Sequence, residues 1–400
     1  MKIGIVTTWF PAGAGYVSKA YRHVLEQQGN TVYIYARSGQ RRKGDVLWDH
    51  SQVTWAPKSH IGTGIWKRHF QKWLSTNRIT HVFFNEQRYW APILWAKECG
   101  VICGAYVDYY TQTTVDAFSV YDFLVCNTKR HYSVFKWHRK CHYIPWGTDV
   151  NKFKPKDFKE KRPVTFLVSA GWEPASVGDR RGSLLALKAF KQVRGVCRLI
   201  FYSQVHKEQM PTIWSESFFG DERIEVRVGS FEPFPFSNGD VYLYPSRLDG
   251  VGLTLPEAVS SGLVAIVPNS APMNEFVEDG VTGKVVEVEK YLGRADGYYW
   301  AESICNVDLL TKAMQYYVDN TLEMEKHKEC ARKFAETNLD WEKNSLAISE
   351  IFHSSKAVKI TCEQQQLIKR MDAQYSPNIM QQARRVLGSL RTCIIGLGEN

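Results

Sequence analysis

The alternation of two kinds of apolar segment constrains the fold of this chain most. Short, β-rich apolar runs alternate with segments whose apolar residues recur at the spacing of a helix. Up to residue 126, strands are expected at 2–9, 31–35, 81–84, 101–107 and 123–126, and helices between Val17 and Gly29, near 65–76 and near 91–98. This alternation predicts a parallel sheet covered by helices on both faces.

The pattern restarts after a polar, basic stretch. Strands are expected at 164–169, 198–202, 224–228, 241–244 and 263–267, and helices at 184–192 and before Gly262. With 400 residues and 44% hydrophobic content, the chain is long enough to bury two cores. We therefore predict two Rossmann-like α/β domains, over 1–150 and 164–340, joined by a linker at 151–163. Parallel sheets that face each other across a cleft would bind ligands at the carboxyl ends of their strands.

The formal charge of +10 favours an anionic partner, which can be a phosphate ligand, a nucleic acid or an anionic membrane. A nucleic-acid-binding protein should carry a basic motif with base-stacking aromatic residues, and no recognised signature is present, so nucleic acid is not expected. The first apolar run is too short for a secretory signal, and no segment approaches the roughly 20 apolar residues of a membrane helix. A cytoplasmic protein is expected, with at most peripheral contact with a membrane.

The segment 241–267 carries the most chemistry. Its strand leads through a loop containing Gly250 and Gly252 into a helix, and the free amides at a helix start form an anion site. Asp249 precedes this helix and Glu257 lies within it. Carboxylates at such a place can accept hydrogen bonds from the hydroxyls of a sugar and a ribose. Taken singly, each acid is better interpreted as an ordinary loop or helix carboxylate, and the strand, glycines and helix together favour the functional interpretation.

This segment resembles the E-x7-E region of family-four retaining glycosyltransferases, with Asp249 in place of the usual first Glu. The resemblance implies the GT-B fold, with acceptor binding by the first domain and nucleotide-sugar binding by the second. It implies that Asp249 lies beside the donor sugar and that Glu257 holds the ribose hydroxyls. The diphosphate is then held by backbone at Gly252, Leu253 and Thr254, with Gly250 in the same loop.

Upstream, GDRRGSLLALKAF resembles the KG-x8-F stretch of that family. Aligning Phe190 with its aromatic residue puts Arg181 where a diphosphate-binding Lys is usual, and Arg181 keeps the charge and adds a bidentate fork. The Arg that commonly follows the family's glycine is replaced by Trp172, and Arg180 or Arg247 is expected to compensate. Solvated surface cations are the alternative interpretation.

Two further matches concern the connections. Residues 144–155 resemble the PNGVDxxxF crossing between the domains, with Phe153 as its anchor. Residues 339–352 resemble the tryptophan-led final helix, so a helix over 341–354 is expected to return to the first domain. Residues 355–400 lie outside the resemblance and form an extension of unknown role that is expected to be helical.

Residues of the first half are candidates for the acceptor side. Gly15, in the loop before the first helix, stands where the family's glycine loop lets the donor phosphate approach. Asn85, Glu86 and Arg88 follow one strand and Asp108 and Tyr109 follow another, which makes them candidates for acceptor contacts. Many family members have a His where this chain has Asp108, which either orients a hydroxyl or caps the loop.

The basic helix expected near 65–74 has two interpretations. Its Ile65, Trp66, Phe70, Trp73 and Leu74 lie at helical spacing, with Lys67, Arg68 and Lys72 on other faces. It either contacts an anionic membrane that carries a lipid-linked acceptor or covers the sheet.

We therefore expect a metal-independent, retaining hexosyltransferase with Asp249, Arg181 and Asp108 in catalytic roles. Its donor is a UDP-sugar first and a GDP-sugar second, its acceptor is a hydroxyl of a glycan, a lipid-linked glycan or another molecule, and no cofactor is needed. An NADP-dependent reductase is the alternative enzyme, with Gly13 and Gly15 in a GxG-like loop and Arg37 on a 2′-phosphate. A sugar-nucleotide-binding protein without catalysis is the other alternative.

Overall fold

The chain forms two compact units. The computed structural model describes residues 1–37, 39–59, 62–156, 162–173, 179–210, 214 and 220–373. The first unit comprises 1–106, 113–124 and the chain from 352 onward, and the second comprises 107–112 and 125–351.

A seven-stranded sheet organises the first unit, in the order β3-β2-β1-β4-β5-β6-β7. Its strands are β1 (Lys2–Thr7), β2 (Thr31–Ala36), β3 (Val53–Trp55), β4 (His81–Asn85), β5 (Ile102–Tyr106), β6 (Phe123–Cys126) and β7 (Cys141–Tyr143). β1 pairs in parallel with β2 and β4, β2 with β3, and β4 with β5. All five predicted strands are present. β7 and the last residues of β6 belong to the second unit by their contacts, so the predicted domain boundary at 150 stays a prediction.

Helices α1 (Gly13–Gln27), α2 (Lys67–Thr76) and α3 (Ala91–Glu98) connect these strands. α2 turns its apolar side to the sheet, because Phe70, Trp73 and Leu74 are buried. The Trp73 ring lies so close to β1 that a Cβ on Gly4 would stand 2.4 Å from it. α2 therefore covers the sheet with its apolar side. Its exposed residues are Lys67, Arg68, Lys72, Ser75 and Thr76, and Trp66, which precedes the helix, is 57% exposed.

The second unit repeats this architecture with a six-stranded sheet in the order β10-β9-β8-β11-β12-β13. The strands are β8 (Val164–Gly171), β9 (Cys197–Ser203), β10 (Ile224–Val228), β11 (Val241–Leu243), β12 (Val264–Pro268) and β13 (Gly283–Val286). In both sheets the first strand of the unit lies between its second and fourth, which is the Rossmann order. The prediction of two Rossmann-like domains is confirmed.

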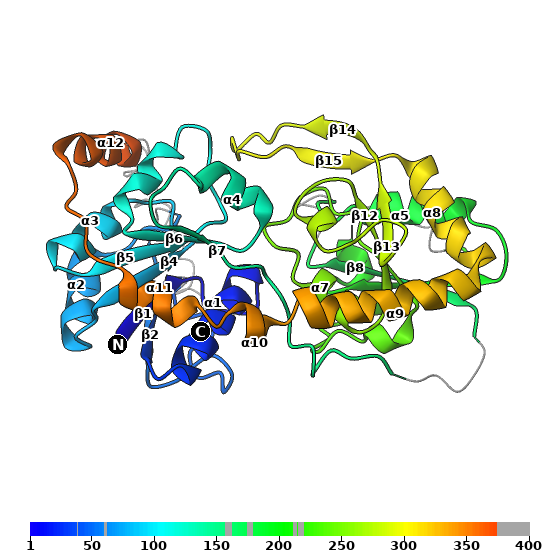
Figure 1. Cartoon of the computed structure of the whole chain (residues 1–400), viewed down its shortest axis with the longest axis horizontal. Helices are drawn as coiled ribbons and strands as arrows, with labels where there is room; N and C mark the ends of the chain where they lie inside the picture. Colours follow the sequence, from blue (N-terminus) through cyan, green and yellow to red (C-terminus); the bar gives the residue numbers. More distant parts are fainter. Residues whose placement is uncertain are drawn as a thin grey trace, which may run out of the picture. The chain divides into compact units, whose positions relative to one another are not determined.

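Several helices and a hairpin complete the second unit (Figure 1). The helices are α4 (Lys129–Phe135), α5 (Ser183–Gln192), α7 (Thr254–Ser260), α8 (Val307–Asp319), α9 (Thr321–Asn338) and α10 (Trp341–Asn344). The strands β14 (Val288–Leu292) and β15 (Glu302–Cys305) pair only with each other, antiparallel, as a separate two-stranded sheet.

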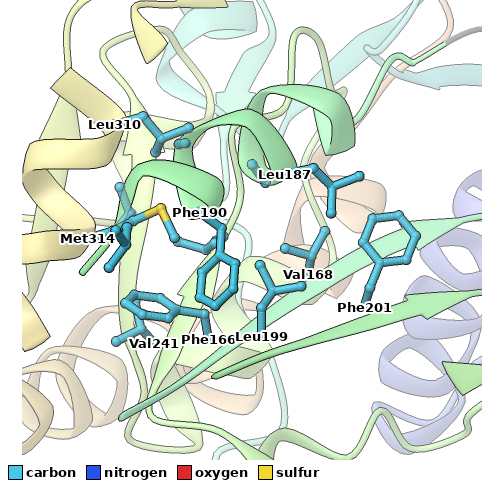
Figure 2. Close-up of a cluster of buried hydrophobic side chains, with 14 of the residues drawn as sticks. Phe166, Val168, Leu187, Phe190, Leu199, Phe201, Val241, Leu310 and Met314 are labelled. Carbon is cyan, nitrogen blue, oxygen red and sulfur yellow. The ribbon is translucent and has the colours of Figure 1, made fainter. Parts of the chain in front are cut away.

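The core of the second unit fixes α5 on its sheet. Figure 2 shows Phe190 of α5 among side chains of the neighbouring strands and of α8. Phe190 is fully buried, and its ring centroid lies 5.9 Å from that of Phe166 in β8. Truncating a buried Phe to Ala costs about 3–5 kcal/mol. This packing therefore holds α5 on the sheet, and the candidate site lies at the other end of that helix.

The linker predicted at 151–163 is described in part, because residues 157–161 lie outside the described residues. Phe153 is 9% exposed, and its ring lies 6.1 Å from that of Phe236. It is therefore anchored in the second unit.

The end of the described chain packs on the first unit. Where one helix over 341–354 was expected, α10 and α11 (Ile348–Ser354) are separated by a turn at Ser345. Phe352 is buried against the rings of Phe83 and Phe123. Further on, α12 (Cys362–Ala373) lies beside α3 (Figure 1), where the Asp372 carboxylate accepts the amides of Trp90 and Ala91 at 2.9 and 2.7 Å. Residues 374–400 lie outside the described residues.

None of the helices in the described part of the chain has the length and apolar character needed to cross a membrane.

Candidate functional site

The loop between β11 and α7 forms one side of the site. β11 pairs in parallel with β8 and β12 in the middle of the sheet, so this loop leaves the sheet at its carboxyl edge. Gly252 has a φ of +75°, which favours glycine, and a Cβ there would meet the Tyr244 hydroxyl at 3.3 Å. α7 begins at Thr254, directly after this loop. The Thr254 hydroxyl accepts the Tyr242 O–H at 2.8 Å.

Asp249 is the electrostatic centre of this loop. Its carboxylate accepts hydrogen bonds from the hydroxyls of Tyr244 and Ser246, at 2.6 and 2.8 Å. It also pairs with the Arg180 guanidinium at 3.0 Å, and its side chain is 12% exposed. Burial alone would raise the pKa of Asp249, but the guanidinium groups of Arg180 and Arg181 and the two hydroxyls hold it below its ordinary value. The carboxylate is therefore ionised and held in place.

Arg180 and Arg181 stand at the start of α5, opposite that loop. Arg180 also donates to the carbonyl oxygen of Leu248 at 2.8 Å, which ties the two loops together. The Arg181 side chain lies over Gly171 at the end of β8, where a Cβ would stand 3.1 Å from Nε. Its Nη1 is buried and has no hydrogen-bond partner among the described residues. A buried guanidinium nitrogen in this state is a donor poised for an anion.

Gly182 fixes the direction of both arginines. Its φ is +67°, and a Cβ would lie 2.1 Å from the carbonyl oxygen of Pro245. Only glycine fits such a close approach of two backbones. The turn into α5 therefore depends on this residue.

Two acids that the sequence reading missed complete this end of the sheet. Glu173 accepts the backbone N–H of Arg181 at 3.0 Å and is 2% exposed. Burial raises the pKa of Glu173 to about 7, although Arg181 and Arg180 lower it. Asp179 accepts the amides of Ser183 and Leu184 at 2.7 and 2.9 Å. The start of α5 is thus already capped by a carboxylate, and the arginine side chains remain as its anion-binding groups.

Glu257 lies in the first turn of α7 and is partly buried. Its carboxylate has no hydrogen bond to any residue that the structure describes. Burial raises the pKa of Glu257 to about 8, against the lowering influence of Lys152. A carboxyl group without protein partners at a strand end is available to a ligand.

Arg247 and Trp172 differ from the other candidates. The Arg247 guanidinium pairs with Glu302 of β15 at 2.5 Å, so its charge is used to hold the hairpin. Trp172 is 65% exposed. Of the two cations expected to compensate for Trp172, Arg180 lies beside Arg181. Arg247 pairs with Glu302, but its Nε is buried without a hydrogen-bond partner among the described residues and its amide donates to the carbonyl oxygen of Arg180 at 2.8 Å.

Asp108 follows β5 and belongs to the second unit. It lies beside the loop between β11 and α7. A Cβ on Gly250 would stand 2.0 Å from its Oδ1, so Gly250 gives Asp108 its place. No His stands directly after β5 in the sequence. His131 of α4, however, lies with its Nε2 3.8 Å from the Oδ1 of Asp108. Burial, with Arg130 beside it, holds the pKa of His131 well below its ordinary value, so the ring is neutral.

Arg130 is a further residue that sequence reasoning missed. Its guanidinium donates to the carbonyl oxygens of Ala271, at 2.6 Å, and Asp249. Glu275 accepts the backbone amides of Lys129 and Arg130 at 2.6 and 2.9 Å. Together these contacts hold α4 against the Asp249 loop. The sequence signal that could have located this helix is Thr128, which caps α4 by accepting the amide of His131.

Of the remaining candidates, Gly15, Asn85, Glu86 and Arg88 belong to the first unit and Tyr109 belongs to the second. A Cβ on Gly15 would stand 2.1 Å from the carbonyl oxygen of Phe10, which gives this glycine a packing role. The Asn85 amide donates to Ala14 and Ser18, both at 2.9 Å. Glu86 has a φ of +52°, and the amide of Arg88 donates to Thr63.

Arg37 bears on the reductase alternative. It is 7% exposed and donates to the carbonyl oxygens of Asn85, at 2.5 Å, and Glu86, at 3.3 Å. Burial lowers the pKa of Arg37 to about 10. Backbone carbonyl oxygens thus hold two nitrogens of this guanidinium, whereas its Nε is buried without a hydrogen-bond partner among the described residues.

Within the described residues, no group of three or more His, Cys, Asp or Glu side chains is placed to hold a metal ion. A cavity of about 1280 Å³ elsewhere in the second unit is lined by residues such as Lys156, Phe236 and Arg332, and none of the candidate residues lines it.

No protein-family model matches this chain, and no curated protein sequence matches it. Solved structures do. Sucrose-phosphate synthase from Thermosynechococcus elongatus superimposes with a TM-score of 0.68 and 14% identity, covering 88% of this chain and 98% of that one. A glycosyltransferase from Rickettsia africae gives 0.70 and 14%, covering 88% and 99%. HepE from Anabaena, in complex with UDP-glucose, gives 0.68 and 13%, covering 88% and 100%.

At these identities the similarity shows the fold alone. The chain has the GT-B fold, with two Rossmann-like units.

Proposed function

We propose that this protein is a retaining glycosyltransferase that moves a hexose from a nucleoside diphosphate sugar to a hydroxyl of a glycan, a lipid-linked glycan or another acceptor. The observation that carries the proposal is the buried, unpartnered Nη1 of Arg181 at the carboxyl ends of β8 and β11. Beside it lie Arg180 and the ionised Asp249. A doubly charged diphosphate matches this arrangement, because fixed guanidinium donors bind phosphate oxygens strongly.

The donor is a UDP-sugar in first place and a GDP-sugar in second. Solved structures with this fold include complexes with UDP and with UDP-glucose, which supports uridine. The amides at Gly252, Leu253 and Thr254 face the diphosphate, and Glu257 accepts the ribose hydroxyls. The arginines neutralise the phosphates in place of a metal ion, and no cofactor takes part.

In the reaction, the bond between the anomeric carbon and the phosphate oxygen breaks, and the acceptor oxygen bonds to the same face of the sugar. The acceptor proton passes to the leaving phosphate oxygen, where negative charge accumulates. Arg181 stabilises that charge. Asp249 holds Arg180 and the loop beside the sugar, and Asp108 orients a hydroxyl.

The protein acts in the cytoplasm, with peripheral contact with an anionic membrane when its acceptor is lipid-linked. The exposed side of α2, with Trp66, Lys67, Arg68 and Lys72, supplies the aromatic and basic groups for such contact. Liposome flotation tests it: binding must rise with the fraction of anionic lipid, and equal binding to neutral vesicles contradicts it.

A thermal-shift screen of UDP, GDP and ADP, with their sugars, tests the donor site. A ligand that binds only the folded state raises its melting temperature. One nucleotide should stabilise the wild type, and Arg181→Gln should abolish the shift. Arg227→Gln is the matched control, since Arg227 pairs with Glu225 on β10, away from the site. Equal shifts in all three proteins would refute the assignment. Release of nucleoside diphosphate on turnover separates the enzyme from a protein that only binds.

A further inference from the structure

An aromatic cluster lies next to Asp108 in the second unit. It consists of Tyr109, Tyr110, Phe135, Tyr298, Tyr299 and Trp300. Tyr298, Tyr299 and Trp300 come from the loop that joins β14 to β15, and the others come from residues 107–112 and α4. The rings of Tyr109 and Tyr298 are stacked, with centroids 5.2 Å apart and planes at 21°.

Hydrogen bonds fix the cluster in one arrangement. The amide of Tyr299 donates to the carbonyl oxygen of Tyr110 at 2.9 Å. The Tyr298 hydroxyl donates to the backbone carbonyl oxygen of Asp108 at 3.0 Å. The Trp300 indole donates to the Tyr110 hydroxyl at 2.6 Å, which in turn bonds to Nδ1 of His131 at 2.9 Å. The loop is therefore positioned before any ligand arrives.

One ring of this ordered cluster is open to solvent. Tyr299 is 41% exposed, although its ring contacts those of Tyr110 and Trp300, each with centroids 5.3 Å apart. An exposed aromatic face on a rigid base is a typical part of a binding site.

The charges around the cluster argue against a phosphate at this place. Arg130, which lies over the Trp300 ring, donates to the carbonyl oxygens of Ala271 and Asp249. Arg294 pairs with Asp296 at 2.6 Å. An uncharged molecule with an apolar face and hydroxyl groups therefore suits the cluster better than a phosphate does.

We propose that the aromatic cluster is the acceptor subsite and that it binds a pyranose ring of a glycan. The ring lays its C–H face on Tyr299 and directs a hydroxyl toward Asp108, whose Oδ1 would lie 2.0 Å from a Cβ on Gly250. The inference rests on the proposed function, because it names the acceptor class of that same site. It assigns the choice of acceptor to the β14–β15 hairpin.

Saturation-transfer NMR with methyl α- and β-glycosides of glucose, galactose and mannose tests the subsite without any donor. At least one glycoside should receive saturation from the wild type. Tyr299→Ala should weaken this binding about fivefold, since a ring contact is lost, and Tyr299→Phe should keep it. Tyr291→Ala is the control, because Tyr291 is 58% exposed on β14 of the same hairpin.

Three results would overturn the subsite: no saturation of any glycoside by the wild type, equal loss in Tyr291→Ala and Tyr299→Ala, or displacement of the glycoside from Tyr299 by uridine. Each leaves the UDP-induced thermal shift and its dependence on Arg181 as they were. The proposed function and the acceptor subsite therefore fail by separate measurements.

Discussion

Asp249→Asn is expected to lower the free energy of unfolding of the second unit by about 2 kcal/mol. The variant keeps the size of the side chain and removes its charge. Asparagine has one acceptor oxygen, and Arg180 is a donor only, so the oxygen must face Arg180. The amide group then faces the hydroxyls of Tyr244 and Ser246, which can rotate to accept from it.

The magnitude follows from this rearrangement. All three contacts survive, but the bond to Arg180 changes from a charge-assisted one worth about 1.5–3 kcal/mol to a neutral one worth about 1. Breaking a fully buried ion pair costs about 3–5 kcal/mol, and the lower figure is used because the Arg180 side chain is 39% exposed. Arg181, which also lowers the pKa of Asp249, loses a counter-charge.

Hydrogen exchange at increasing urea concentration, read on peptides from β8 and β11, reports this unit separately from the first. Arg180→Gln and the double variant complete a cycle in which the pair should show a coupling of about 1–2 kcal/mol. The pKa of Asp249 is lower in the folded state, so its contribution is present above the unfolded value near 3.9 and is lost as the pH falls. The difference between wild type and variant must shrink below about pH 4. An unchanged urea midpoint for Asp249→Asn at pH 7 would show that the pair contributes nothing.

Three further outcomes are expected. Burial raises the pKa of Glu257 from 4.5 to about 8, so between pH 5 and 8 the folded state binds more protons than the unfolded state. The free energy of unfolding should therefore fall as the pH rises, by up to about 1.4 kcal/mol per pH unit. Glu257→Gln should flatten that decline in urea titrations between pH 5 and 8. Gly182→Ala should destabilise the protein by about 1–3 kcal/mol more than Gly280→Ala. The two glycines have similar φ values, +67° and +70°, but only a Cβ at Gly182 would meet backbone, at Pro245. Equal melting temperatures of the two variants would contradict this. Asp372→Ala should cost about 1 kcal/mol and speed amide exchange at the start of α3, and unchanged exchange there would count against a capping role.

Most of the fold could be predicted from the sequence because each strand is a short apolar run bounded by turn residues. Residues 81–84 and 241–244 have this form, and β4 and β11 lie there. The short strands β3 and β7 were not predicted, since three residues carry no periodicity and their pairing depends on a neighbour already in place. The parallel Rossmann order follows from strand–helix alternation.

The site was predictable where its residues are close in sequence. Asp249, Gly252 and the start of α7 belong to one loop, and the strand–glycine–helix pattern located them. Contacts between distant segments were not predictable. Arg247 was grouped with the phosphate cations because of its position in that loop, and its pairing with Glu302 of the hairpin could not be seen from sequence spacing.

His131 is a second example of a contact between segments that are distant in the sequence. The family resemblance pointed to a His directly after β5. His131 instead reaches Asp108 from α4, a helix that was not predicted. Glu173 was overlooked because only folding brings its carboxyl group to the amide of Arg181. Sequence spacing holds no information about either approach.

The β14–β15 hairpin closes its ladder on itself, so the register of the six-stranded sheet does not depend on it. Substitutions or changes of length in its loop therefore leave the ladder of that sheet intact, although they alter the contacts of Tyr298 with Asp108 and of Trp300 with Arg130. On the proposal that this loop binds the acceptor, a protein built this way can exchange one recognition surface for another by altering about ten consecutive residues. Variation among relatives should accordingly concentrate in this hairpin while the loops at the strand ends stay constant.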